Sequence, residues 1–312
     1  MPINHTPIKK EEEKNLKREE KYILTEAKYT FEDIILPEKV KDEIENAIAL
    51  NKYKKLIFET WGLDAVFKTS RNISINLYGY SGTGKSMTAH AIAAALNKKI
   101  LMVNFSEIES KYVGETSKNL VDLFKYAEKS DAVILFDEAD ALLSKRVTMM
   151  NSATDVSVNQ TRNVLLKILD NYSGVVIFTT NFIQNYDVAF LRRISSHIKF
   201  DMPNEEMRKR LWEYYLVPQL PISVEREKII ASLSKVESIT GADIATVVLK
   251  TAVKAARLSM EITENELKEQ MDSVIAIKKM IKDDKFTITT KKVPESFVKE
   301  KVLNGGMIGG NI

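Results

Sequence analysis

Gly79-Tyr80-Ser81-Gly82-Thr83-Gly84-Lys85-Ser86 is the stretch that decides the fold of this 312-residue chain. It follows an apolar run, INLY, and precedes an alanine-rich helical pattern, MTAHAIAAAL. Glycines at this spacing let successive backbone N–H groups turn toward phosphate oxygens, and the N-terminus of the following helix adds a positive dipole. The stretch therefore predicts a phosphate-binding loop between a strand and a helix.

The residue types in this loop predict a nucleotide and a divalent cation as ligands. A lysine at this position reaches the β- and γ-phosphates, and the hydroxyl of the next residue binds Mg²⁺. We therefore expect Lys85 on the phosphates and Ser86 on the metal. The residues of this segment expected to contact the nucleotide are Gly79, Ser81, Gly82, Thr83, Gly84, Lys85, Ser86 and Met87.

A second motif, Val133-Ile134-Leu135-Phe136-Asp137-Glu138, is an apolar strand that ends in two carboxylates. A carboxylate pair at a buried strand end is unfavourable unless a cation compensates it. In a nucleotide site, Asp137 orders the Mg²⁺ shell and Glu138 accepts a proton from the attacking water. The two motifs together predict a site that hydrolyses a nucleotide.

Short apolar runs alternate with helical patterns after Tyr29. This alternation predicts an α/β fold in which helices cover a buried, mostly parallel sheet. The expected strands are Ile73–Tyr78, Ile100–Phe105, Ala132–Phe136, Val175–Thr180 and Ile198–Phe200.

Strand patterns stop after Pro203, and a capping box of Thr263 and Glu266 opens the last of the helical patterns that follow. These patterns cover residues 204–216, 225–234, 241–258 and 263–281. We expect four parts: a charged N-terminal arm (1–28), an α/β nucleotide-binding domain (29–202), a small helical domain (203–282) and a C-terminal tail (283–312).

The composition excludes several classes of protein. The chain has no cysteine and three histidines, which excludes disulfides, zinc ribbons and Fe–S clusters and argues against a multi-histidine metal site. The net charge of +3 is too small to indicate a nucleic-acid partner. No apolar run reaches the roughly 20 residues that span a bilayer. The N-terminus lacks the apolar core of a signal peptide, so we expect a cytoplasmic protein without a membrane span.

The two motifs, together with the segment TFEDIILPEKVKDEI from Thr30, resemble the AAA+ ATPases, in particular the branch of katanin, spastin and the Cdc48-like remodellers. The resemblance extends from about Thr30 to about Val274. It implies an AAA+ large domain, which is a P-loop NTPase parallel sheet flanked by helices, followed by a small α-helical lid domain. It also implies ATP and Mg²⁺ as cofactors, and hydrolysis of ATP to ADP and phosphate.

The resemblance also assigns roles to single residues. Asn181, at the end of VVIFTTN, matches the sensor-1 residue that helps to orient the lytic water. In FLRRISSHIKFDMP, Arg193 matches the first arginine finger, Ser196 falls where the second would be, and Arg192 is an alternative finger. The positions that match the lid motif and the adenine pocket are Gly241, Ala242, Asp33, Ile34, Leu211 and Tyr215.

Lys111-Tyr112-Val113-Gly114-Glu115 resembles pore loop 1 of this branch, in which an aromatic residue beside a lysine lines the central channel of a ring. The resemblance implies that Lys111, Tyr112 and Val113 grip a polypeptide without reading its sequence. The polar stretch Ser144–Asn159 is either pore loop 2 or a solvated loop.

These observations favour an ATP-driven protein remodeller, an unfoldase or disassembly factor. It is expected to form a homo-oligomeric ring, a hexamer, and to act on a protein substrate or adaptor of unknown identity. Two other classes stay open. Nucleic-acid machinery, such as clamp and helicase loaders, uses the same ATPase core, but the near-neutral charge argues against it. A nucleotide-dependent scaffold with slow hydrolysis is the other, and the presence of Glu138 and Asn181 argues against that class.

Overall fold

The computed structural model describes residues 22–67, 72–103, 115–144, 153–181, 186–222 and 225–283. The chain groups into two compact units, Met1–Met271 and Asp272–Ile312. The boundary between them falls within the last helix, α12 (Glu264–Asp283). The sheet and the cavity discussed below belong to the first unit.

Strands and helices alternate in the first part of the chain, as the sequence predicts. The strands are β1 (Leu24–Thr25), β2 (Ile73–Gly79), β3 (Ile100–Val103), β4 (Val133–Phe136), β5 (Val175–Thr180) and β6 (Ser196–Phe200). The helical segments up to β6 are η1 (Phe31–Asp33), α2 (Glu38–Lys55), η2 (Leu56–Thr60), η3 (Leu63–Ala65), α3 (Lys85–Ala95), α5 (Glu115–Lys129), α6 (Asp140–Leu143), α7 (Ala153–Asn171) and α8 (Val188–Leu191).

The strands in the described part of the chain form one six-stranded sheet in the order β1-β3-β4-β5-β2-β6. β1 pairs with β3 in the antiparallel direction, and all the other neighbours are parallel. β5 therefore lies between β2, which leads into the glycine-rich loop, and β4, which leads to Asp137. Because parallel strands end at the same edge of a sheet, the three segments that follow these strands meet there.

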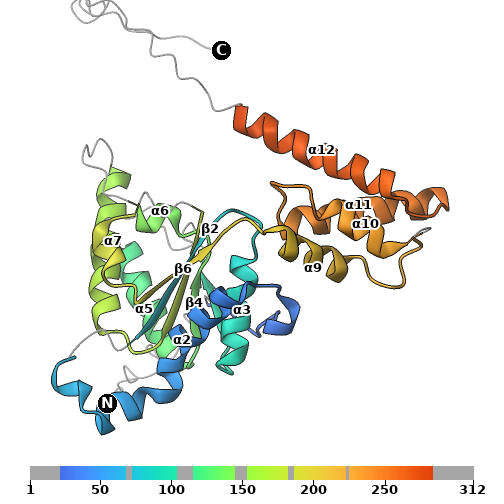
Figure 1. Cartoon of the computed structure of the whole chain (residues 1–312). Helices are drawn as coiled ribbons and strands as arrows, with labels where there is room; N and C mark the ends of the chain where they lie inside the picture. Colours follow the sequence, from blue (N-terminus) through green and yellow to red (C-terminus); the bar gives the residue numbers. More distant parts are fainter. Residues whose placement is uncertain are drawn as a thin grey trace, which may run out of the picture. The chain divides into compact units, whose positions relative to one another are not determined.

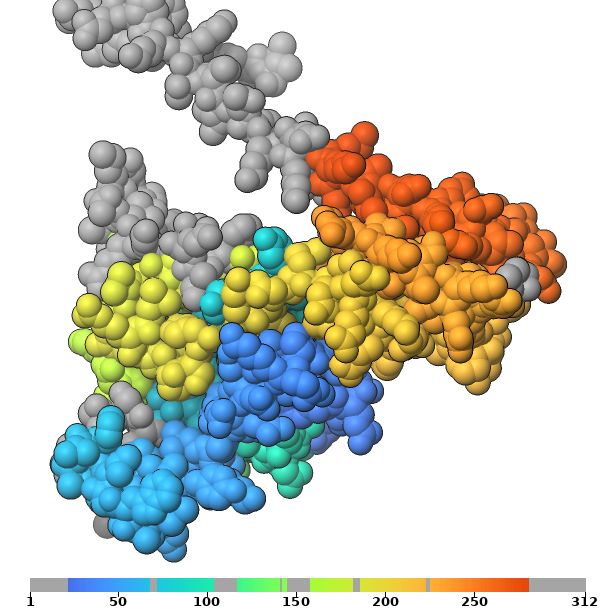
Figure 2. Space-filling model, viewed as in Figure 1, coloured from blue at the N-terminus to red at the C-terminus, as the bar shows by residue number. Residues whose placement is uncertain are grey.

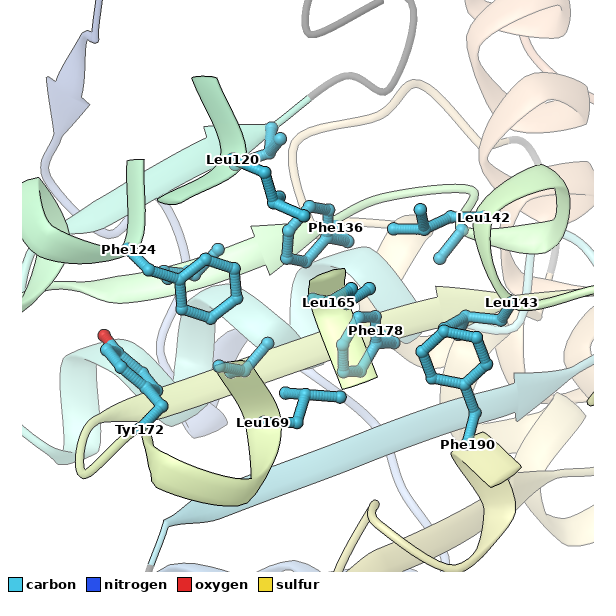
Figure 3. Packing of buried hydrophobic residues seen from close by; sticks show 14 of the residues in the cluster. Leu120, Phe124, Phe136, Leu142, Leu143, Leu165, Leu169, Tyr172, Phe178 and Phe190 are labelled. Atoms are coloured by element: carbon cyan, nitrogen blue, oxygen red, sulfur yellow. The ribbon is translucent and has the colours of Figure 1, made fainter. Parts of the chain in front are cut away.

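Two hydrophobic layers hold the sheet. One packs it against α5, α6 and α7, where Phe136 and Phe178 stack with ring centroids 5.2 Å apart. Phe124 of α5 contacts Tyr172 edge to face in the same layer, as Figure 3 shows. The other layer packs the sheet against α2 and α3, which lie on its opposite face in Figure 1. The predicted α/β fold, a mostly parallel sheet flanked by helices, is confirmed.

β2 differs from the wholly apolar strand β4 because its buried residues alternate between apolar and polar: Ile73, Ser74, Ile75, Asn76 and Leu77. The Ser74 hydroxyl donates to the carbonyl of Arg193 (3.2 Å) and accepts a hydrogen bond from the Ser195 amide (2.9 Å). One side of the strand is thus fixed by hydrogen bonds to the segment that precedes β6, in place of apolar packing.

Helices follow β6, as predicted: α9 (Glu205–Tyr215), α10 (Arg226–Leu233), α11 (Gly241–Leu258) and α12. The capping box is confirmed, since Thr263 N donates to Glu266 Oε2 (3.0 Å) and Glu266 N donates to Thr263 Oγ1 (3.4 Å). Arg208, which is buried in α9, donates from Nε to the Ser234 carbonyl and from Nη1 to the Pro203 carbonyl, both at 2.7 Å. Within the described residues, no helix is long and apolar enough to cross a membrane.

Two segments differ from the sequence-based expectations. Leu24 and Thr25, which were assigned to a charged arm, pair with Leu101 and Ile100 as the edge strand β1. Residues 153–159, assigned to a polar loop, belong to α7. The expected strand Ile100–Phe105 is described only as far as Val103.

Candidate functional site

A cavity of about 460 Å³ lies where β2, β4 and β5 end. This volume is in the range of small-molecule and cofactor sites. Its walls come from the glycine-rich loop, the acidic turn after β4, the end of β5, the segment around Ile34, and helices α9 and α11. On the face drawn in Figure 2, the blue surface of the N-terminal residues adjoins the yellow surface of the α9 region, and both segments contribute to this cavity.

The glycine-rich loop needs glycine at Gly82 for two reasons. Its φ of +76° is unfavourable for a residue with a side chain, and a Cβ there would lie 2.6 Å from Thr240 Oγ1 and 3.0 Å from Ala242 Cβ. The Ala242 amide donates to the Gly82 carbonyl at 3.2 Å. The loop is therefore fitted directly against the start of α11, where Gly241 and Ala242 were expected to approach the nucleotide.

Gly79 has a structural role in addition to the contact expected of it. It does not line the cavity, and a Cβ on it would lie 2.0 Å from the Phe200 carbonyl oxygen. Its own carbonyl accepts a hydrogen bond from Lys85 Nζ at 2.9 Å. Glycine is required at this position by the close approach of β6, and the predicted contact between Gly79 and a nucleotide stays a prediction.

Lys85 lies almost buried at the mouth of the loop, with 8% of its surface exposed. Its Nζ donates to the carbonyl of Tyr80 (2.7 Å) as well as that of Gly79, and to Oδ1 of Asn181 (2.9 Å). Burial lowers the pKa of Lys85, and the negative charge of Asp137 is the strongest of the opposing effects. The structure thus brings the loop lysine, Asn181 and the acidic turn together, as the sequence predicts.

The acidic turn after β4 is held by hydroxyl groups. The Ser86 hydroxyl donates to Asp137 Oδ1 at 2.8 Å, and the Thr179 hydroxyl donates to the same oxygen. Glu138 lines the cavity and has a left-handed backbone with φ of 53°. A serine hydroxyl beside a carboxylate is a set of hard oxygen donors, so Ser86 and Asp137 fit Mg²⁺.

The opposite part of the cavity is mainly apolar and aromatic. All six positions predicted for the adenine pocket and the lid motif line the cavity: Asp33, Ile34, Leu211, Tyr215, Gly241 and Ala242. Tyr214 and Tyr215 contact each other edge to face, with ring centroids 5.1 Å apart. Burial raises the pKa of Tyr215, so its hydroxyl stays protonated near neutral pH. This wall suits a planar, uncharged base, whereas the loop with Lys85 suits phosphates.

Arg192 and Arg193 lie outside the lining of this cavity. Arg193 Nε forms an ion pair with Asp170 Oδ1 at 2.9 Å, and Arg193 Nη1 donates to the Ala189 carbonyl at 3.2 Å. Arg192, one residue earlier, is exposed. Arg193 is therefore held by an ion pair and a hydrogen bond within the chain, whereas the Arg192 side chain is open to solvent. The proposed pore-loop residues Lys111, Tyr112 and Val113 lie outside the described residues.

Several lining residues were not predicted from the sequence, chiefly Thr179, Thr180, Ile35, Met207 and Tyr214. The two threonines had a readable signal, because they are polar residues at the end of an otherwise apolar strand that leads to Asn181. Thr180 donates its hydroxyl hydrogen to Asp140. Met207 and Tyr214 had no such signal, since their places in the cavity depend on how α9 folds back toward the loop.

Residues 75–202 match the family model described as "ATPase family associated with various cellular activities (AAA)". The chain is 30% identical over 246 residues to 26S proteasome regulatory subunit 4 homolog B of Arabidopsis thaliana, covering 76% of this chain and 53% of that protein. It is 27% identical over 273 residues to 26S proteasome regulatory subunit 4 homolog of Oryza sativa subsp. japonica, covering 77% and 60%.

A probable 26S proteasome regulatory subunit 4 of Caenorhabditis elegans is 31% identical over 212 residues, covering 65% of this chain and 47% of that protein. The chain thus spans about half the length of the curated relatives it matches.

Proposed function

We propose that this chain hydrolyses ATP and uses the energy to remodel a protein substrate, because residues 75–202 match the AAA ATPase family model. The AAA domain agrees with the family predicted from the motifs. The relatives described above are proteasome regulatory subunits, so they do not support the finer assignment to the branch of katanin, spastin and the Cdc48-like remodellers.

In this proposal each residue at the strand ends has a defined task. Lys85 binds the β- and γ-phosphates, and Ser86 and Asp137 hold Mg²⁺. Mg²⁺ held by these two residues would neutralise charge that develops on the phosphoryl oxygens. Glu138 accepts the proton of the attacking water, and Asn181 helps to orient that water. The bond from Lys85 Nζ to Asn181 Oδ1 (2.9 Å) and the bond from the Ser86 hydroxyl to Asp137 Oδ1 (2.8 Å) support these roles.

Assembly into a ring, a hexamer, would complete each site with an arginine of the neighbouring subunit. Arg193 is the first candidate and Arg192 the second. A cation supplied in this way stabilises the negative charge of the transition state. The exposure of Arg192 supports it as a contact to a neighbour, while Arg193 would first have to leave Asp170.

The proposed substrate is a polypeptide. One support is that the relatives are proteasome regulatory subunits. The other is the sequence Lys111-Tyr112-Val113, which resembles a pore loop that grips protein chains. Lys111 and Val113 are the sequence neighbours of Tyr112 and belong to the same proposed grip on the polypeptide. The substrate or adaptor is of unknown identity, and a cytoplasmic location stays a prediction.

The observation that carries the proposal is the meeting of Lys85, Glu138 and Asn181 on one cavity of nucleotide size. Glu138→Gln is the decisive variant, because it removes the proton acceptor and leaves the phosphate loop intact. We expect it to bind ATP, to assemble and to retain substrate, which affinity purification followed by mass spectrometry would identify. Lys85→Ala, which loses ATP binding, is the matched control. Hydrolysis by Glu138→Gln at the wild-type rate would contradict the catalytic assignment.

The pore-loop part of the proposal needs its own variant. Tyr112→Ala removes the ring, whereas Tyr112→Phe keeps it and loses only the hydroxyl. We expect the alanine variant to hydrolyse ATP at the basal rate and to lose remodelling of the trapped substrate, and the phenylalanine variant to retain both. An alanine variant that still remodels at the wild-type rate would exclude gripping by Tyr112.

A further inference from the structure

We propose that Thr179 is a positioning residue for the hydrolytic site: its hydroxyl ties both Asp137 and Glu138 to strand β5 and holds Glu138 in its left-handed conformation. The inference rests on the proposed function, because it concerns the residues that would hold Mg²⁺ and activate water.

The sheet places Thr179 where it can reach the acidic turn. β5 lies between β2 and β4, and the register pairs Thr179 with Leu77 on β2. On the other side, the last β4 residue, Phe136, pairs with Phe178. Thr179 is thus the first residue of β5 beyond the end of β4. Only 2% of its surface is exposed, so its side chain is fixed by its surroundings.

Three consecutive residues of the turn are bonded to Thr179. The Thr179 hydroxyl donates to Asp137 Oδ1 and accepts a hydrogen bond from the Glu138 amide at 3.0 Å. The Ala139 amide donates to the Thr179 backbone carbonyl at 2.9 Å. A hydroxyl group carries one hydrogen and two lone pairs, so it can donate and accept at the same time. Valine or alanine at this position could make only the backbone bond.

The bond to the Glu138 amide matters because of the conformation it holds. A residue with a Cβ is disfavoured at a φ of 53°, and such conformations persist when the surroundings fix them. The Glu138 carboxylate forms no hydrogen bond or ion pair with the described residues, so the backbone, which sets the direction of its Cα–Cβ bond, is what anchors this side chain at the cavity. Fixing the amide therefore fixes the direction in which the side chain of the proposed base leaves the backbone.

The bond to Asp137 has a separate effect. Asp137 Oδ1 accepts from both Ser86 and Thr179, which fixes the side-chain rotamer. In the described part of the chain, Oδ2 makes no hydrogen bond, and Asp137 lines the cavity. The Thr179 hydroxyl thus orients the Asp137 carboxylate, which is proposed for the Mg²⁺ shell. Through the backbone amide it also anchors Glu138, which is proposed to accept the proton of the attacking water.

Thr179→Val tests this inference, since it removes the hydroxyl and keeps the branched shape. Thr179→Ser restores a hydroxyl and is the rescue variant. The control is Thr251→Val: Thr251 is 1% exposed in α11, and its hydroxyl donates to the Val247 carbonyl at 2.8 Å, away from the cavity. Thr251→Val therefore measures how much activity is lost when any buried threonine hydroxyl is removed, apart from its position at the site. The assays use the full chain in its assembled form.

We expect Thr179→Val to lower kcat for ATP by about 10- to 100-fold, as for a displaced catalytic group, with KM changed by less than about threefold. The gain in affinity for a fluorescent ATP analogue on adding Mg²⁺ should also shrink, and this readout does not depend on turnover. Thr179→Ser should stay within about threefold of wild type in both assays, and Thr251→Val should match wild type.

The inference is overturned if Thr179→Val keeps wild-type kcat and Mg²⁺ dependence, if Thr179→Ser falls as far as Thr179→Val, or if Thr251→Val shows the same loss. These results differ from failure of the proposed function, which would appear as a wild-type assembly that binds but does not hydrolyse ATP. In that case the Mg²⁺-dependent affinity of the three variants still decides the positioning role.

Discussion

Arg193 is the first candidate for the cation that completes a neighbouring site, and its ion pair with Asp170 makes this testable. The Nε–Oδ1 distance is 2.9 Å, and the two side chains are 33% and 36% exposed. A pair this open to solvent contributes about 0.2–1 kcal/mol, so its loss raises the unpaired fraction of Arg193 by at most about fivefold. An arginine finger contributes about 10³–10⁵ in rate, or about 4–7 kcal/mol of barrier.

We therefore predict that Arg193→Ala lowers kcat in assembled rings by at least about 10³-fold. Asp170→Asn should leave kcat between the wild-type value and about five times that value. Nucleotide affinity should be unchanged in both variants, because neither side chain lines the cavity of its own subunit. Phosphate release at saturating ATP measures kcat, and titration with a fluorescent ATP analogue measures affinity.

Mixed assemblies provide the control. In a ring that contains Arg193→Ala and Glu138→Gln subunits, some sites take Glu138 from one subunit and Arg193 from its neighbour. Such rings should regain hydrolysis that neither parent shows. If Arg193→Ala stays within about tenfold of wild type while Arg192→Ala shows the large loss, the reasoning about Arg193 is refuted and Arg192 is the finger.

Three further predictions concern the loop, the core and pH. Gly82→Ala should weaken ATP binding by about tenfold or more because its Cβ would lie 2.6 Å from Thr240 Oγ1; unchanged affinity in titrations would contradict this. Phe178→Ala should lower the free energy of unfolding by about 3–5 kcal/mol in urea titrations, whereas Leu249→Ala, at an exposed site, should change it by less than about 0.5 kcal/mol. Burial, reinforced by the Lys28 charge, lowers the pKa of His90 below its usual 6.5, so its contribution to stability is present above pH 6.5 and is lost as pH falls. His90→Gln should therefore lose less stability than wild type between about pH 7.5 and 5.5, and an equal loss would exclude His90 as the cause.

The parts of the fold with a strong local signal were predictable from the sequence. β5 has the predicted bounds, Val175–Thr180. A glycine before the run and an asparagine after it mark where the strand begins and ends. The loop residues Ser81–Met87 all line the cavity, since glycine spacing and a following helix determine that geometry locally. Helices α9 to α12 were placed within two residues by their apolar periodicity.

Features that depend on distant parts of the chain were not predictable. β1 has two residues, Leu24 and Thr25, and it exists because β3 offers a free edge. The ion pair between Arg193 and Asp170 joins α7 to the end of α8, and no local pattern marks it. The bonds of Thr179 follow from the order β4-β5-β2, which sequence patterns do not encode. Each of these is a long-range contact whose partner residue lies in another segment, so no pattern within one segment determines it.

The hydrogen bonds of Arg208 have a consequence for how the helices after β6 can move. Proline has a fixed φ, and Arg208 holds the Pro203 carbonyl while it also holds Ser234. Arg208 therefore ties Pro203 to both α9 and the end of α10. β6 ends at Phe200, so only Asp201 and Met202 lie between the strand and Pro203. A movement of these helices relative to the sheet would have to be taken up by the backbone of Asp201, because the residue before a proline is itself restricted.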